Sequence, residues 1–228
     1  MLYFRGCVIR DKLPEIDAAT KKILESSGID YKILSDEKCC GSFLIRTGFY
    51  DDAEELMKSN LDVFINEKIL VSCAGCYKTL KKDYKELLGI ELDVVHSSEF
   101  FQDLIVNGKI KMKKTSALIT YHDPCHLGRY CNQYDAPRFV ISQIGDLVEM
   151  EKNKETSRCC GSGGGVRSAY HEISQEIASM RMEDAEKSKA DIICTACSFC
   201  NLNLNSACKK GEKVFDLSEI ILMGLEDE

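Results

Sequence analysis

Residues 157–165 read Ser-Arg-Cys-Cys-Gly-Ser-Gly-Gly-Gly, and residues 39–42 read Cys-Cys-Gly-Ser. A pair of adjacent cysteines followed by Gly-Ser therefore occurs twice, 120 residues apart. Three more cysteines recur at offsets of 118 to 121 residues: Cys7 as Cys125, Cys73 as Cys194 and Cys76 as Cys197. A spacing held this closely over such a distance indicates a duplicated unit.

Strand-like apolar runs alternate with helix-like stretches in both halves of the chain. Strands are expected at Leu2–Arg5, Tyr31–Leu34, Ile69–Val71, Val94–Val95, Ala117–Thr120, Leu147–Met150, Ile192–Ile193 and Val214–Phe215. Helices are expected at Pro14–Ser26, Asp51–Ile65, Tyr77–Leu88, Ser98–Val106, Pro137–Ile144, Ile173–Lys187, Phe199–Ala207 and Leu217–Leu225. This alternation predicts an α/β fold of two similar repeat halves, each a small, mostly parallel sheet flanked by helices.

The polar and basic segment Asn107–Thr115 separates the two halves. It shows no hydrophobic periodicity, so we expect a solvated linker there. We therefore divide the chain into a first cysteine-rich domain, residues 1–112, and a second cysteine-rich domain, residues 113–228.

The repeated cysteines follow predicted strand ends. In open α/β sheets, ligands bind in the crevice outside the carboxyl ends of the strands. We therefore expect five thiols to converge at one edge of each sheet. The first set is Cys7, Cys39, Cys40, Cys73 and Cys76, and the second set is Cys125, Cys159, Cys160, Cys194 and Cys197.

The chain has 228 residues, of which 13 are cysteines, and a net charge of −7. This acidic balance argues against nucleic-acid binding, which needs a basic surface. The sequence has no apolar run long enough to span a membrane, and its first residues lack the apolar region of a secretory signal. We expect a cytoplasmic protein with reduced thiols, which favours metal binding or redox chemistry over a disulfide framework.

Three kinds of site use cysteines in such numbers. A structural zinc ion takes four ligands, usually as two short-spaced pairs, whereas each half offers one such pair and three other thiols. A thiol–disulfide catalyst needs only Cys-x-x-Cys, which leaves the other repeated cysteines unexplained. An iron–sulfur cluster is held by thiolates and is favoured, because adjacent cysteines suit a body larger than one ion. The glycine-rich turn Gly161–Gly165 would let backbone N–H groups donate to anionic sulfur.

Several other residues have chemistry but no clear place in the repeat. Cys131, Cys200 and Cys208 have no counterpart in the first half, and we interpret them as ordinary core or surface thiols. Arg46 and Arg129 follow repeated cysteines and could bind substrate carboxylates or phosphates. Structural or surface salt bridges are the favoured interpretation for both arginines.

His122 and His126 flank Cys125. Either imidazole could donate a proton to a departing thiolate near neutral pH. A structural hydrogen bond is the alternative, and the sequence does not favour one role over the other. His96 and His171 are interpreted as ordinary loop and surface residues.

The pattern of a cysteine, a Cys-Cys-Gly motif and a Cys-x-x-Cys motif, written twice, resembles the twin cysteine-rich, or CCG, domain family. Here 31 residues separate Cys7 from Cys39, and 33 separate Cys125 from Cys159. The strings most similar to catalytic subunits of the heterodisulfide reductase type are Cys-Cys-Gly-Ser-Gly-Gly-Gly (159–165), His-Asp-Pro-Cys-His-Leu-Gly-Arg (122–129) and Ser-Cys-Ala-Gly-Cys (72–76).

This resemblance implies two non-cubane 4Fe–4S clusters, one per half, that face a substrate cavity between the halves. It implies that the first set of five cysteines holds one cluster and the second set holds the other. Zinc in the first site is left open.

The resemblance also implies an oxidoreductase subunit that reduces a small-molecule disulfide, with His122 and His126 as candidate catalytic residues. The chain lacks the ferredoxin motif of many relatives. We therefore expect electrons from a ferredoxin-type iron–sulfur subunit or a flavoprotein, and such a partner can be membrane-bound. One alternative is an electron-transfer iron–sulfur subunit of a flavin-dependent 2-hydroxy-acid (glycolate or lactate) dehydrogenase or a fumarate reductase complex. The other is a structural zinc module.

Overall fold

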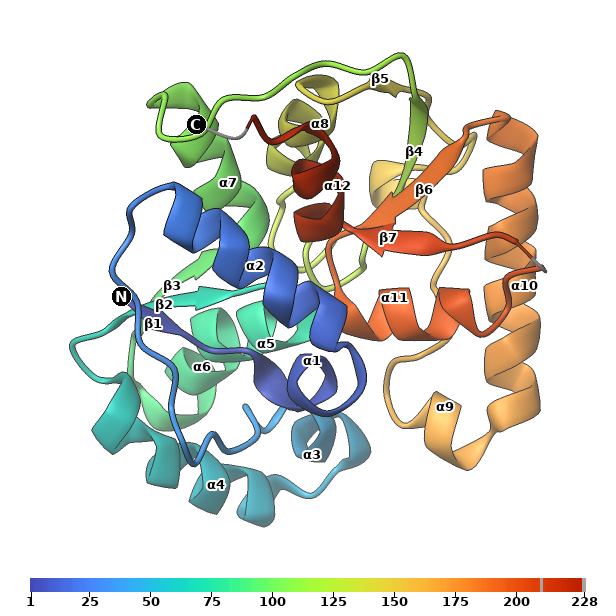
Figure 1. Cartoon of the computed structure of the whole chain (residues 1–228). Coiled ribbons are helices and arrows are strands. Elements are labelled where there is room, and N and C mark those ends of the chain that lie inside the picture. Colours follow the sequence, from blue (N-terminus) through green and yellow to red (C-terminus); the bar gives the residue numbers. More distant parts are fainter. Residues whose placement is uncertain (210, 227–228) are drawn as a thin grey trace.

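Two parallel sheets, one in each half, form the frame of the molecule (Figure 1). The computed structural model describes residues 1–209 and 211–226. The first sheet has the order β1-β2-β3, with β1 at Leu2–Tyr3, β2 at Lys68–Val71 and β3 at Asp93–His96. The second has the order β5-β4-β6-β7, with β4 at Leu118–His122, β5 at Asp146–Leu147, β6 at Ile192–Thr195 and β7 at Val214–Asp216. All neighbouring strands pair in parallel, which confirms the predicted α/β class with two similar halves.

Helices flank both sheets, as the alternating pattern predicted. The first half contains α1 (Gly6–Lys12), α2 (Pro14–Ser26), α3 (Ser42–Thr47), α4 (Tyr50–Phe64), α5 (Ala74–Lys78), α6 (Tyr84–Leu88) and α7 (Ser97–Val106), with a π-helical turn at Thr79–Asp83 between α5 and α6. The second half contains α8 (Asp135–Ser142), α9 (Val166–Ala169), α10 (His171–Ser188), α11 (Ser198–Asn205) and α12 (Leu217–Gly224), with a 3-10 turn at Lys154–Thr156. Within the described part of the chain, no helix is both long and apolar enough to cross a membrane.

The short helices α1, α3 and α9 were not expected from the sequence, and one expected strand is almost absent. Residues 31–34 contribute only a single bridge, between Lys32 and Leu2. None of these four residues is fully buried: Tyr31, Ile33 and Leu34 are only partly covered by the core, so this edge segment buries too little surface to hold a longer strand. In the second sheet β5 pairs with β4 at the corresponding edge, so the two halves share one topology.

The order of the strands creates one topological switch point in each half. From β4 the chain goes to β5 on one side and afterwards to β6 on the other. Ligands of open α/β sheets bind where the strand order reverses in this way, outside the carboxyl ends of the strands. Cys125 follows β4 and Cys197 follows β6, while Cys7 and Cys73 follow β1 and β2 in the first half. The fold thus directs the cysteine-bearing loops of each half to its switch point.

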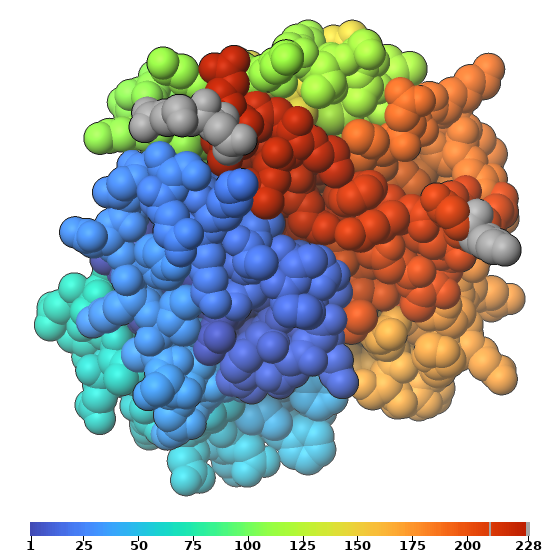
Figure 2. Space-filling model, in the orientation of Figure 1, coloured from blue at the N-terminus to red at the C-terminus, as the bar shows by residue number. Residues whose placement is uncertain are grey.

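The two halves pack reciprocally. Helix α2 of the first half lies against α12 of the second, and α7 of the first lies against α8 of the second. In Figure 2 the blue surface of α2 meets the red surface of α12 directly. Buried side chains of both halves belong to one hydrophobic core, so the burial of apolar surface stabilises the two halves as one body.

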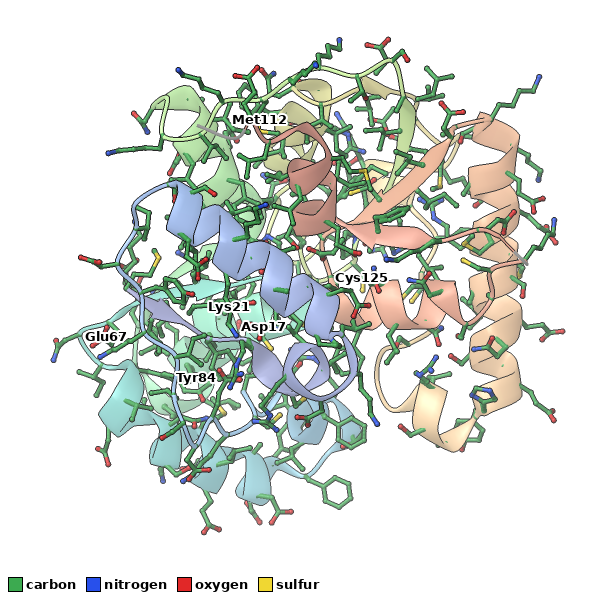
Figure 3. All side chains as sticks on the ribbon, in the orientation of Figure 1. Asp17, Lys21, Glu67, Tyr84, Met112 and Cys125 are labelled. Atoms are coloured by element: carbon green, nitrogen blue, oxygen red, sulfur yellow. The ribbon has the colours of Figure 1, made fainter. Side chains whose placement is uncertain are left out.

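The segment 107–115 is more ordered than the expected solvated linker. Ile110 is buried in the core. The backbone N–H of Lys113 donates to the carbonyl of Gly224 at 2.7 Å, and Met112 (labelled in Figure 3) forms a bridge with Leu225. The middle of the segment therefore docks on the end of α12, which corrects the expectation of a fully solvated linker. The domain boundary between residues 112 and 113 stays a proposal.

Both last helices begin with a capping box. Asp216 Oδ1 accepts a hydrogen bond from the backbone N–H of Ser218 at 3.0 Å, and Glu219 accepts one from the backbone N–H of Asp216 at 2.9 Å. His96 and Glu99 form the same arrangement at the start of α7. His96 is therefore a fully buried capping residue, which corrects its interpretation as an ordinary loop residue.

Candidate functional site

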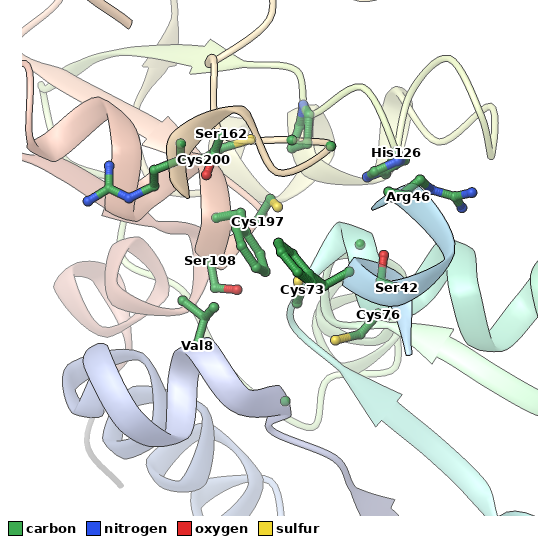
Figure 4. Close-up of a pocket in the computed structure, with 18 of the residues that line it drawn as sticks. Val8, Ser42, Arg46, Cys73, Cys76, His126, Ser162, Cys197, Ser198 and Cys200 are labelled. Atoms are coloured by element: carbon green, nitrogen blue, oxygen red, sulfur yellow. The ribbon is translucent and has the colours of Figure 1, made fainter. Parts of the chain in front are cut away.

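One cavity of about 310 Å³ lies where the cysteine-bearing loops of the two halves meet. Ten of the thirteen cysteines line it, five from each half: Cys7, Cys39, Cys40, Cys73 and Cys76, and Cys125, Cys159, Cys160, Cys197 and Cys200. Figure 4 shows Cys73 and Cys76 of the first half on one side, with Cys197 and Cys200 of the second half on the other. The two expected clusters of thiols therefore share one chamber.

The thiols contact one another in a fixed order. The series in the first half is Cys7, Cys39, Cys40, Cys76 and Cys73. The series in the second half is Cys125, Cys159, Cys160, Cys200 and Cys197. The two series meet where Cys73 contacts Cys197. Ten sulfurs thus form one continuous series. The order of the equivalent cysteines is the same on both sides of the contact between Cys73 and Cys197.

Cys194 lies outside the cavity, although the repeat predicted it as a ligand. It is fully buried within β6, where its thiol donates to the carbonyl of Thr195 at 3.8 Å. Tyr121 pairs with Cys194 as Tyr3 pairs with Leu70, so the first-half counterpart of Cys194 is a core leucine. The strand extends two residues further than expected and carries Cys194 into the interior of the sheet. The structure therefore places nine of the ten predicted ligands at the cavity and leaves Cys194 out of it.

Cys200 occupies the place that was predicted for the second cysteine of the motif. Cys73 precedes α5 and Cys197 precedes α11 as N-cap residues, so Cys76 and Cys200 lie in the first turn of equivalent helices. Cys73 and Cys197 are 124 residues apart, and so are Cys76 and Cys200. The interpretation of Cys200 as an ordinary thiol is thus corrected. The signal in the sequence was the overlapping motif Cys194-x-x-Cys197-x-x-Cys200, in which either pair fits the repeat.

Glu37 positions Cys7 at the start of α1. Its carboxylate is buried and accepts hydrogen bonds from the backbone N–H groups of Arg5 and Gly6, at 3.0 and 2.9 Å. Gly6 has φ +74°, and a Cβ added there would lie 2.9 Å from Cys76 Sγ. Only glycine lets this turn approach the sulfurs so closely.

The two Cys-Cys-Gly turns bring backbone N–H groups to sulfur, as the glycine-rich stretch predicted. The N–H of Gly161 donates to Cys159 Sγ at 3.3 Å, and the N–H of Gly41 interacts in the same way with Cys39. Gly161 has φ +85°, and a Cβ there would lie 2.6 Å from the carbonyl oxygen of Ser174. These turns supply the donor hydrogen bonds that stabilise anionic sulfur.

In each half the first cysteine of the adjacent pair has a strongly lowered pKa, and contacts with Cys197 and Cys76 also lower the pKa of Cys73. Contacts with Cys40 and Cys7 lower the pKa of Cys39 to about 3, and contacts with Cys125 and Cys160 lower the pKa of Cys159 to about 2. The contact with Cys159 raises the pKa of Cys160 to about 12. Because the thiolate is the form that binds metal, Cys39 and Cys159 are prepared as ligands.

The donor set fits a polynuclear iron–sulfur centre better than a single ion. Five sulfurs from each half exceed the four ligands of a tetrahedral zinc site. The adjacent cysteines of each pair both face the same cavity, which is far larger than one metal ion needs. The chamber therefore has the ligand type, number and space that iron–sulfur clusters require.

The two candidate histidines have different surroundings. His126 lines the cavity, packs against Tyr130 at a ring distance of 5.2 Å, and lies beside Arg46 (Figure 4). Burial and the nearby positive charge of Arg46 lower the pKa of His126. His122 is buried behind the cavity wall, and its Nδ1 accepts a hydrogen bond from Arg181 Nε at 3.0 Å. Of the two histidines, only His126 thus lines the cavity.

The arginines divide in a similar way. Arg129 donates to the carbonyl of Ser157 at 2.7 Å and lies outside the cavity, so its role is structural. Arg46 lines the cavity and also forms an ion pair with Asp83 at 2.6 Å. Arg167, which the sequence analysis did not single out, lines the cavity from α9. Arg167 follows Arg46 by 121 residues, which is the spacing of the repeat. This spacing could have identified Arg167 from the sequence.

The other singled-out residues lie outside the cavity. Cys131 and Cys208 are half-buried and do not line it, in agreement with their interpretation as ordinary thiols. His171 is exposed at the start of α10, as expected of a surface residue.

Comparison with known proteins supports this description of the chain as a repeat. A family profile for the cysteine-rich (CCG) domain matches residues 1–81 and 119–205. The chain is 40% identical, over 98% of its length, to a subunit of the dihydromethanophenazine:CoB--CoM heterodisulfide reductase of Methanosarcina acetivorans, and it covers 58% of that relative. It is 37% identical, over 99% of its length, to a subunit of the CoM/CoB fumarate reductase of Methanothermobacter marburgensis, and it covers 46% of that relative.

A third relative is the EtfAB:quinone oxidoreductase of Syntrophomonas wolfei, with 32% identity over 99% of this chain and 34% of the relative. The chain thus spans about one third to three fifths of the length of these relatives. Since the family profile matches both halves and the ten cavity cysteines follow its repeat, the chain belongs to the cysteine-rich (CCG) domain family.

Proposed function

We propose that the ten cavity cysteines hold two iron–sulfur clusters of the non-cubane 4Fe–4S type, one in each half. Cys7, Cys39, Cys40, Cys73 and Cys76 would hold the first cluster, and Cys125, Cys159, Cys160, Cys197 and Cys200 the second. The observation that carries this proposal is the mirrored series of five sulfurs in each half. Clusters bound there would accept and release single electrons.

The chain would act as an oxidoreductase subunit that reduces a small-molecule disulfide within the cavity. Reduction of a disulfide consumes two electrons and two protons and releases two thiols. The cavity supports this role because the two cysteine series meet in one chamber, so both sulfurs of a disulfide could reach cluster-bearing walls. Heterodisulfide reduction is also the activity that the name of one relative gives.

Side chains of the cavity would bind the substrate and supply a proton. Arg46 and Arg167 present positive charge from α3 and α9, which suits a disulfide that carries anionic groups. His126 would be the proton donor, because it lines the cavity and its imidazolium form can give a proton to a departing thiolate and become neutral. His122 would not act as an acid, because it lies outside the cavity and burial, together with Arg181, lowers its pKa to about 3.

Electrons would come from another protein or from a further domain, either a ferredoxin-type iron–sulfur unit or a flavoprotein. The relatives are much longer than the matched region, which leaves room for such modules in them. We further propose that the chain works in the reducing cytoplasm, because all thirteen cysteines are free.

A second candidate is an electron-transfer subunit of a flavin-dependent dehydrogenase or of a fumarate reductase complex, with no substrate of its own. Two relatives are named for fumarate and quinone chemistry, which favours this alternative. The two functions differ in whether a disulfide reacts at the cavity.

The test begins with metal analysis of anaerobically purified protein. Two four-iron clusters predict about eight iron atoms per chain and a brown colour. A colourless protein with zinc alone would contradict the cluster proposal. Turnover of the CoB–CoM heterodisulfide with a reduced viologen dye then separates the functions. Turnover that falls in Arg46→Gln supports disulfide reduction, whereas an iron-loaded protein that only exchanges electrons with the dye supports the electron-transfer alternative.

A further inference from the structure

The two halves differ at one buried position beside their sulfurs. His122 precedes Cys125 by three residues, as Phe4 precedes Cys7. A Cβ on Gly161 would meet the carbonyl oxygen of Ser174, and a Cβ on Gly41 would meet that of Ala53, so Ser174 and Ala53 are equivalent positions of α10 and α4. Seven residues further along each helix lie Arg181 and Asn60, so His122 and Arg181 correspond to Phe4 and Asn60. Asn60 donates to the carbonyl of Cys39, and Phe4 packs instead against Phe64, four residues further along α4.

The counterpart of His122 in the first half, Phe4, has an apolar neighbour. Phe4 and Phe64 are each 1% exposed, and their rings meet edge to face with centroids 5.4 Å apart. A Cβ on Gly6 would lie 3.8 Å from the ring of Phe4 and 2.9 Å from Cys76 Sγ, which places this pair next to the first set of sulfurs. Phenyl rings offer those sulfurs no N–H donor and no charge.

The second-half pair is polar and held rigidly. Arg181 is fully buried and donates from Nε to His122 Nδ1 at 3.0 Å. Its Nη1 donates to the carbonyl of Lys152 at 2.8 Å and lies 3.4 Å from Asp184 Oδ2. These partners fix the guanidinium group against the imidazole ring.

The contact with Arg181 decides which nitrogen of His122 carries the proton. Arginine is always a donor, so Nδ1 must be the acceptor and the proton of the neutral ring must be on Nε2. Nε2 is buried and has no hydrogen-bond partner among the described residues. A ring nitrogen of His122, Cys160 Sγ and Cys200 Sγ all lie within 4.8 Å of one another. The imidazole therefore lies beside the sulfurs of the second half with its one N–H on Nε2, which the surrounding protein leaves without a partner.

We propose that the Arg181–His122 pair is a positioning and tuning device, in which His122 Nε2–H donates to the sulfurs around Cys160 and Cys200 and makes the second half the preferred site of the electron. This inference rests on the proposed function. Hydrogen bonds to cluster sulfurs and nearby positive charge raise a reduction potential, because they stabilise the more negative reduced state. The first half has Phe4 at the place of His122, and its Asn60 donates to a backbone carbonyl, so it lacks this stabilisation.

The test uses the anaerobic, iron-loaded full chain and a redox titration followed by EPR. The double substitution His122→Phe with Arg181→Leu gives the second half an apolar pair without stranding a buried arginine. We expect unchanged iron content, a shift of one midpoint potential to a more negative value, and a smaller gap between the two clusters. His122→Gln, which keeps an N–H donor, should restore part of the gap. Phe4→Leu, at the first-half counterpart of His122, is the matched control and should leave the gap unchanged.

Two outcomes would overturn the inference while the proposed function stands. The first is full iron content with both midpoint potentials unmoved in the double variant. The second is loss of about half of the iron in His122→Gln, which would make His122 a ligand.

A measurement on the wild-type protein avoids any folding defect of the variants. Pulsed EPR of protein labelled with 15N-histidine should detect a weak nitrogen coupling in the second cluster, as expected of a hydrogen-bonded ring. A strong coupling, or none, would contradict the donor role. An iron-free wild-type protein would refute the proposed function itself, and the inference with it.

Discussion

The two halves of the molecule place their sulfurs alike but support them differently. In the first half, Asn60 of α4 donates to the carbonyl of Cys39 at 2.9 Å. In the second half, Asn203 of α11 donates to the carbonyl of Cys160 at 2.6 Å. The cysteine pair is thus anchored by an amide in both halves, but the amide comes from a different helix and reaches a different cysteine.

The loops after the two pairs differ as well. Gly41 leads directly into α3, so Ser42 and Arg46 reach the cavity from a helix. After Gly161 the chain continues as a glycine-rich loop, and α9 begins only at Val166. The comparison teaches that the strand frame and the turn at the cysteine pair fix the sulfur positions. The surrounding side chains can then vary, and they can give the two sites different properties.

The largest effect in this comparison is expected at the Cys-x-x-Cys motif. Cys76→Ser and Cys200→Ser should each remove about half of the iron, because each takes a thiolate from one proposed cluster. Cys194→Ser should keep the iron and lose about 1–3 kcal/mol of stability, because it buries a hydroxyl inside a strand. Iron per chain, visible spectra and urea unfolding measure these outcomes.

Cys131→Ser and Cys208→Ser are the matched controls, since both thiols lie outside the cavity. Neither should change the iron content or the spectrum. If Cys194→Ser lost its iron while Cys200→Ser kept it, Cys194 would be a ligand and Cys200 would not. The strand β6 would then have to end before Cys194.

An intermediate effect is expected at the glycine of each turn. Gly161→Ala should cost about 3–4 kcal/mol, because it combines a left-handed backbone with a contact of 2.6 Å to the carbonyl oxygen of Ser174. Gly41→Ala should cost about 1–2 kcal/mol, because its nearest neighbour is the flexible side chain of Met57 at 3.4 Å. Urea unfolding of the iron-free chains compares the two losses. Equal losses would mean that the second turn is not the more tightly packed one.

The smallest effect concerns the dependence of stability on pH at two equivalent helix caps. Burial lowers the pKa of His96 to about 4 and raises the pKa of Asp216 to about 7. Between about pH 4 and 6.5, unfolding therefore adds a proton to His96 and removes one from Asp216. His96 makes stability rise with pH in this window, whereas Asp216 makes it fall, each by up to about 1.4 kcal/mol per pH unit.

Substituting each cap with asparagine tests these opposite contributions, since asparagine can still cap a helix. His96→Asn should make the slope of unfolding free energy against pH less positive, and Asp216→Asn should make it more positive. Urea unfolding of the iron-free chain at several pH values measures both slopes. Slopes that move in the same direction would show that the two caps do not titrate as described.

Much of the fold could be predicted because the chain repeats itself. The alternating pattern predicted α2 with its observed bounds, and the remaining expected helices to within a few residues, since amphipathic periodicity is a local property. The short helices α1, α3 and α9 escaped prediction because four to seven residues carry too little periodicity. The strand expected at residues 31–34 failed for a different reason, because strand pairing depends on a partner and a buried face.

The sequence also predicted most of the candidate site, and the prediction differed from the structure at one cysteine. Nine of the ten cavity cysteines were named in advance from spacing alone. Cys194 was chosen over Cys200 because two overlapping motifs fit the repeat and the end of β6 was set two residues too early. Spacing along the chain cannot decide this, because a shift of the strand end changes which residues face the core and which leave the sheet.

The sequence by itself determined that the chain is doubled, that it is α/β, and that each half gathers thiols at the ends of its strands. These properties follow from periodicity and spacing, which are written along the chain. Only the tertiary structure decided that both sets share one chamber, that Cys73 lies next to Cys197, and that Phe4 packs against Phe64 in one half while its counterpart His122 is held by Arg181 in the other. The physical reason is that these contacts join residues far apart in sequence, and only the packing of the two halves brings them together.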